Sequence, residues 1–67
     1  MNTLQKLDRD IKKAIDEGQE HKRNAIMAND PQTVRSEITK CELSVMTAEA
    51  LLEIRENLMK KVVHFWN

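Results

Sequence analysis

Apolar residues recur along most of the chain at spacings of three and four, the period of one face of an α-helix. The one strong break is Asn29-Asp30-Pro31. Asn can take the left-handed conformation that ends a helix, Asp can cap the next helix, and Pro suits the first turn of that helix. The pattern predicts a helix over about residues 3–28, a turn over about 29–31 and a second helix over about 31–65.

Composition supports the same reading, because Leu, Ala, Glu, Lys and Met are abundant and there is one glycine and one proline. Two helices joined by so short a turn fold back antiparallel. The predicted fold class is therefore all-α: a single two-helix antiparallel hairpin over residues 1–67, coiled-coil-like, and completed by a partner chain or by dimerisation.

The first helix carries one apolar stripe, which weakens around Gly18, His21 and Lys22. The second helix carries a longer stripe in alternating steps of four and three, broken at Arg55. The members of this stripe are Val34, Ile38, Cys41, Val45, Ala48, Leu52, Met59, Val62 and Trp66. Folding the hairpin about Asp30 predicts that this stripe packs on the first helix, with Cys41 near Gly18.

A second apolar stripe runs beside the first on the longer helix, so the apolar arc is too broad for one neighbouring helix to cover. The aromatic residues at the chain end resemble the anchors found in protein interfaces. We therefore expect a partner helix to bind these residues. The predicted partner-binding residues are Leu43, Met46, Leu51, Ile54, Leu58, Phe65 and Trp66.

At 67 residues the chain lies near the lower limit for a self-sufficient hydrophobic core. Chains of this size are usually held together by disulfides, a metal or association, and the lone Cys41 cannot form an internal disulfide. Partner binding is the remaining route. A single thiol also favours a reducing compartment, and we expect a cytoplasmic protein.

Eleven basic and eleven acidic residues give zero formal charge. Because no basic face is available to neutralise phosphates, we expect no nucleic-acid partner. The first residues lack the apolar core of a signal peptide, and no stretch approaches the roughly 20 apolar residues that span a bilayer. We expect no insertion into a membrane.

The sequence offers little for catalysis. A two-helix unit encloses no pocket of its own, so we expect no enzymatic activity and no small-molecule substrate. Cys41 is interpreted as a packed residue and His21 as a partly exposed seam residue. Cys41, His21 and His64 are too far apart to share a metal ion, and no cofactor motif is present.

The layout resembles small proteins of bacterial type III secretion systems. The residues that carry the resemblance are Thr3-Leu4, Leu7-Asp8 and Asn29-Asp30-Pro31-Gln32, followed by a long second helix with an aromatic end. The resemblance is to the cytosolic co-chaperone of the needle subunit and to the needle subunit itself, whose helices are joined by an Asp-Pro turn. The first helix lacks the aromatic-containing segment of needle subunits, so the co-chaperone fits better. The resemblance implies binding to other helices and no catalysis.

A homodimer remains an alternative. Two such hairpins can form a four-helix bundle, as in small plasmid or phage regulators, and the broad arc of the second helix suits this arrangement equally well. Sequence alone leaves a helical partner protein and a second copy of the chain as open possibilities.

Overall fold

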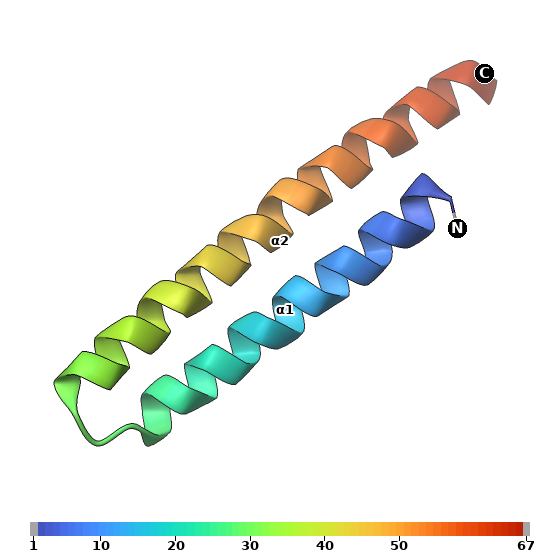
Figure 1. Ribbon diagram of the computed structural model, residues 1–67. Helices are drawn as coiled ribbons and strands as arrows, with labels where there is room; N and C mark the ends of the chain where they lie inside the picture. The colour runs from blue at the N-terminus through green and yellow to red at the C-terminus, as the bar shows by residue number, and fades with distance from the viewer. Residues whose placement is uncertain (1, 67) are drawn as a thin grey trace.

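Two long helices form an antiparallel hairpin in the computed structural model (Figure 1). The structure describes the backbone of residues 2–66 and the side chains of residues 2–61. Helix α1 spans Thr3–Met27 and helix α2 spans Pro31–Trp66. The all-α hairpin predicted from the sequence is confirmed. The predicted helix ends at residues 28 and 65 each differ from the observed bounds by one residue.

Helix α1 begins at a reciprocal cap. The backbone N–H of Gln5 donates to Oδ1 of Asn2 at 2.8 Å, and the backbone N–H of Asn2 donates to Oε1 of Gln5 at 3.4 Å. Both N–H groups lie before the first intrahelical hydrogen bonds and would otherwise bond only to water. Asn2 therefore fixes the start of α1.

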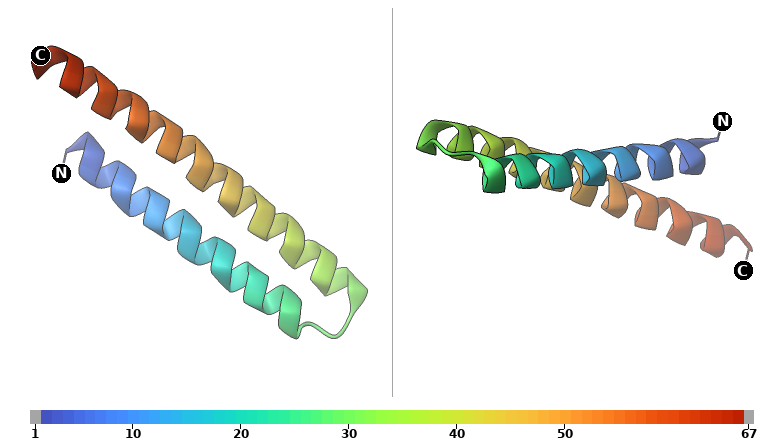
Figure 2. Two further views of the ribbon diagram at one scale, coloured as in Figure 1. Left: turned by 180° about the vertical axis from the view of Figure 1, so that it is seen from behind. Right: turned by 90° about the horizontal axis from the view of Figure 1, so that it is seen from below.

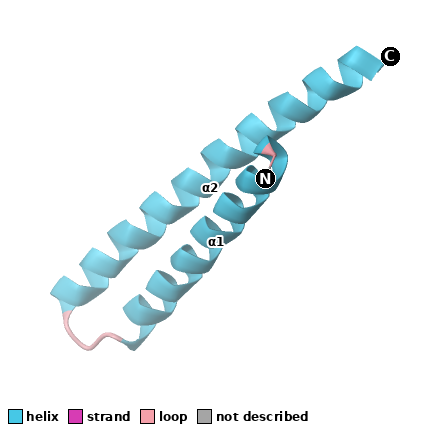
Figure 3. Ribbon diagram, turned by 45° about the vertical axis from the view of Figure 1, so that its right-hand side comes forward, coloured by secondary structure: helices cyan, strands magenta, loops and turns pink. Residues whose placement is uncertain are grey.

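The connecting loop is short and extended (Figure 3). Ala28 ends α1 with φ −71° and ψ 144°, and none of the described non-glycine residues has a positive φ. The left-handed Asn29 expected from the sequence is thus wrong, because an extended Ala28 turns the chain instead. Asp30 caps α2 as predicted: its Oδ2 accepts from the backbone N–H of Thr33 at 2.8 Å, which lowers the pKa of Asp30.

Small residues form the centre of the contact between the helices, and larger side chains flank them. Among the described side chains, the buried apolar residues are Leu7, Ile11, Ala14 and Ala48. Gly18 is buried beside Ser44 at the centre of the hairpin. Small side chains allow the helices to approach closely, and Figure 2 shows them crossing at a shallow angle.

The hairpin exposes an unusually large surface. Its accessible area is 5700 Å², whereas a folded monomer of 7.8 kDa exposes about 4400 Å². The extents of 55 × 18 × 12 Å explain the excess, because a two-helix rod has no interior layer. A chain with so thin a core gains little stability from burial by itself.

Gly18→Ala is expected to stabilise the hairpin by about 1 kcal/mol, because Ala favours helix over Gly by about that amount. A Cβ at this position would lie 3.5 Å from Cβ of Ser44, which is ordinary van der Waals contact. Urea unfolding at fixed protein concentration measures the change. A destabilised variant would show that the helices are closer at Gly18 than this structure has them.

Candidate functional site

The residues of α2 that face α1 repeat every three and four positions, but they are not all the predicted ones. One residue of this set is buried and the others are half-buried. The set is Val34, Glu37, Cys41, Ser44, Ala48, Leu51, Arg55 and Leu58. Helix α2 is therefore rotated about its axis relative to the prediction.

This rotation changes the role of several predicted residues. Val45 and Leu52, for which the sequence predicts packing on α1, remain 45% and 42% exposed. Leu51 and Leu58, for which it predicts partner binding, are instead half-buried in the hairpin. Val45 still contacts α1, since its Cγ2 lies 3.8 Å from the Cβ position at Gly18. The predicted packing on α1 is wrong for Leu52, whose place is taken by Leu51 and Leu58. Binding of a partner by Leu51 and Leu58 stays a prediction.

Two polar side-chain pairs bridge the hairpin in the observed orientation of α2. Nδ1 of His21 donates to Oε2 of Glu37 at 2.6 Å, and Nε of Arg55 donates to Oδ1 of Asp8 at 2.6 Å. Both pairs require Glu37 and Arg55 to face α1. Arg55 interrupts the predicted stripe and so lies near α1 in either rotation, whereas Glu37 lies outside that stripe. The His21–Glu37 pair is therefore the one that favours the observed rotation.

With α2 in this orientation, an open apolar groove runs along one side of the hairpin. It consists of two adjoining hollows that share Lys22 and Cys41. The floor is formed by small residues, and branched apolar side chains form the walls. The lining residues are Ile15, Gly18, Gln19, Lys22, Ala25, Ile26, Val34, Ile38, Cys41, Glu42, Val45, Ala48, Glu49 and Leu52.

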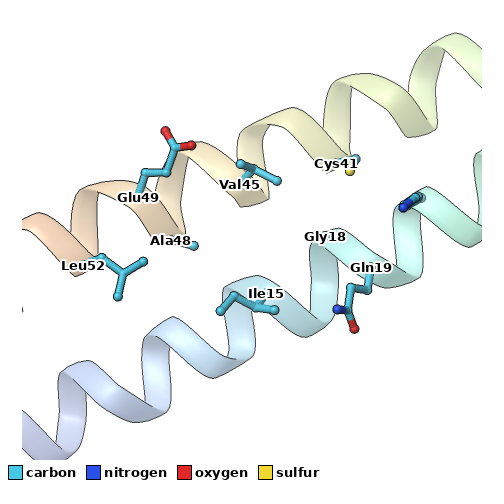
Figure 4. Close-up of a pocket in the computed structure, with 9 residues that line it drawn as sticks. Ile15, Gly18, Gln19, Cys41, Val45, Ala48, Glu49 and Leu52 are labelled. Carbon is cyan, nitrogen blue, oxygen red and sulfur yellow. The ribbon is translucent and has the colours of Figure 1, made fainter.

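The walls of the groove are open to solvent. Ile15 is 43% exposed and Ile38 is 46% exposed, similar to Val45 and Leu52. Figure 4 shows Ile15 on α1 across from Val45 and Leu52 on α2, with Leu52 pointing toward the gap between the helices. A row of partly exposed branched side chains above a floor of small residues fits the side chains of one further helix.

Lys22 and Glu42 stand on opposite rims of the groove. Lys22 belongs to α1, and Glu42 and Glu49 belong to α2. In Figure 4, Glu49 points away from the gap along the outer side of α2. The apolar groove is therefore bordered by positive charge on α1 and by negative charge on α2.

The remaining predicted partner-binding residues lie elsewhere. Leu43, Met46 and Ile54 are 59%, 63% and 48% exposed, and none of them lines the groove. We call these three residues the back stripe of α2. Their role in binding stays a prediction. The predictions for Phe65 and Trp66 lie outside the described side chains.

The structure offers little reactive chemistry. Cys41 is half-buried on the groove floor, and Nδ1 of His21 is hydrogen-bonded to Oε2 of Glu37. Over the described residues, no three His, Cys, Asp or Glu side chains gather closely enough to hold a metal ion. Within the same part of the chain, neither helix is long and apolar enough to cross a bilayer.

Comparisons with protein-family models, with curated proteins and with solved structures return no match to this chain. The groove and the charges on its rims are the features of the described structure that point to a function.

Glu37 makes the hairpin sensitive to acid. The hydrogen bond from His21 lowers the pKa of Glu37 below its usual 4.5, opposed by partial desolvation and assisted by Lys40, whose Nζ lies 3.8 Å from Oε1. A lowered folded-state pKa means that the stabilisation is present above pH 4.5 and is lost as pH falls through the folded pKa.

We expect Glu37→Gln to be less stable than the wild type near neutral pH and to lose this disadvantage on acidification. Urea unfolding of both proteins between about pH 6 and pH 3 measures the difference. Asp30 titrates in both proteins, so its contribution cancels in the comparison. A difference in unfolding free energy that stayed constant with pH would contradict the assignment.

Proposed function

We propose that this chain is a non-enzymatic interaction module that binds a helix of another chain in the groove between α1 and α2. The observation that carries the proposal is the groove itself, with Ile15, Ile38 and Val45 held open to solvent on its walls. Leaving such side chains in water forfeits the free energy of burial, roughly 25 cal/mol per Å² of apolar surface.

The thin core supports the same function. An isolated hairpin buries few large side chains, so binding of a helix would supply the missing third or fourth element of a bundle. Binding to the folded hairpin then also stabilises it by mass action. On this proposal, association and folding stability rise together.

The resemblance to needle-subunit co-chaperones of type III secretion systems would make the bound helix part of a larger helical chaperone. This narrower role, and a cytoplasmic location with it, is supported by the layout of the chain and its Asp30-Pro31 turn. The groove adds a surface on which such a helix would pack.

Val45→Glu is expected to abolish partner binding, whereas Met46→Glu is expected to leave it intact. These neighbours lie on different faces of α2: Val45 lines the groove and Met46 belongs to the back stripe. A charge placed in the buried interface lacks a countercharge and costs several kcal/mol, so affinity should fall at least about 100-fold. Glu favours helix, and circular dichroism should show equal helicity for both variants.

The measurement is affinity capture from a lysate of the native host, with wild type, Val45→Glu and Met46→Glu as parallel baits. A protein captured by the wild type and Met46→Glu, but lost with Val45→Glu, supports the groove. If capture were lost with Met46→Glu alone, the binding site would lie on the back stripe of α2 and not in the groove. Equal capture by all three baits would contradict both surfaces.

A further inference from the structure

We propose that the groove is covered by the groove of a second copy of this chain, with α1 of each copy lying along α2 of the other. The two-fold axis of this dimer runs parallel to the helices, and the product is an antiparallel four-helix bundle. The inference rests on the proposed function, because it names the occupant of the same groove.

The charges on the rims argue for a second copy. Lys22 lines both hollows on the α1 side, and Arg23 lies beside it, while Glu42 and Glu49 line the α2 side. The ion pairs among the side chains of residues 2–61 are His21–Glu37, Lys40–Glu37 and Arg55–Asp8. Within that part of the chain, the rim charges are thus left without close ionic partners.

Only two symmetric arrangements bring two such grooves face to face. A two-fold axis perpendicular to the helices, in the plane between the hairpins, lays α1 on the partner's α1 and α2 on the partner's α2. Basic rim then meets basic rim, and acidic rim meets acidic rim. An axis parallel to the helices lays α1 on the partner's α2, so that opposite charges meet. Because like charges across an interface are repelled, the rims select the second arrangement.

The same arrangement fixes which charges meet. Lys22 and Glu42 line the same hollow, so they lie at the same height along the hairpin. Rotation about an axis parallel to the helices preserves this height. Lys22 of one copy therefore lies across from Glu42 of the partner subunit, and symmetry repeats the pair on the other side. Each rim pair counts twice in the dimer.

The exposed area is sufficient for such a dimer. The surface of 5700 Å² exceeds that of a typical folded monomer of this mass by about 1300 Å². A standard interface buries about 800 Å² on each partner. Covering the groove would bring the surface of each chain closer to that of an ordinary small protein.

Exchanging the two rim charges tests the arrangement. Lys22→Glu alone and Glu42→Lys alone each turn two attractive pairs into two repulsive ones, so each should raise the dimer dissociation constant about tenfold at low ionic strength. Mixing the two variants in equal amounts should restore wild-type affinity. In the mixed dimer the introduced carboxylate of one variant faces the introduced ammonium of the other, and the second pair keeps its native residues. Sedimentation equilibrium measures all three samples.

The mixture distinguishes contacts between chains from effects within one chain. Mixing changes only the partner, so affinity lost through an effect within one chain would not be restored. Lys13→Glu provides the matched control: Lys13 is exposed on α1 and does not line the groove. It should leave the dissociation constant within about twofold of the wild type.

A wild-type chain that stays monomeric at millimolar concentration overturns the proposed dimer. Single variants that associate like the wild type would also overturn it, because with the perpendicular axis each rim meets its own copy and like charges stay opposed. A mixture that fails to restore wild-type affinity would overturn it as well. The proposed function is tested separately by the capture experiment. A monomeric wild type whose captured protein is lost with Val45→Glu would refute the dimer and leave the interaction module standing.

Discussion

The close approach of the two helices over small residues is the constraint on which the rest of the structure depends. Gly18 on α1 lies against Ser44 on α2, and Ala14 and Ala48 are buried along the same line. Small residues bring the backbones together but provide little apolar area to bury. The branched side chains on either side stay at the margin, where they form the walls of the groove. The close contact between the helices and the open groove beside it thus both follow from the small residues at the centre of the hairpin.

Two polar pairs accompany the apolar contacts in the observed orientation of α2. His21–Glu37 and Asp8–Arg55 bridge the two helices near opposite ends of α1. Each pair is partly exposed, and pairs of this kind contribute modestly to stability. Their effect on specificity is larger, because α2 has apolar residues on several faces and could pack through more than one of them. Glu37, which lies outside the predicted apolar stripe, contacts His21 in the observed rotation.

The sequence predicts the helices and the turn because their signals are local. Asp30 and Pro31 mark the start of α2, and Asn2 with Gln5 matches a capping pattern that could also have been read from the sequence. The rotation of α2 could not be read in the same way. Leu51 and Leu52 are equally apolar neighbours, so periodicity alone gives either of them to the seam. The residues of α2 that face α1 also include three polar ones, Glu37, Ser44 and Arg55. The spacing of apolar residues cannot identify them.

The unequal lengths of the helices give the molecule a polarity. Helix α2 has 36 residues and α1 has 25, so α2 extends past the start of α1 (Figure 1). At about 1.5 Å per residue, the difference amounts to roughly 16 Å of helix. In a dimer whose axis runs parallel to the helices, both overhangs leave the bundle at the same end and both loops lie at the other. Such a particle would present its two loops at one end and two separate single-helix extensions of α2 at the other.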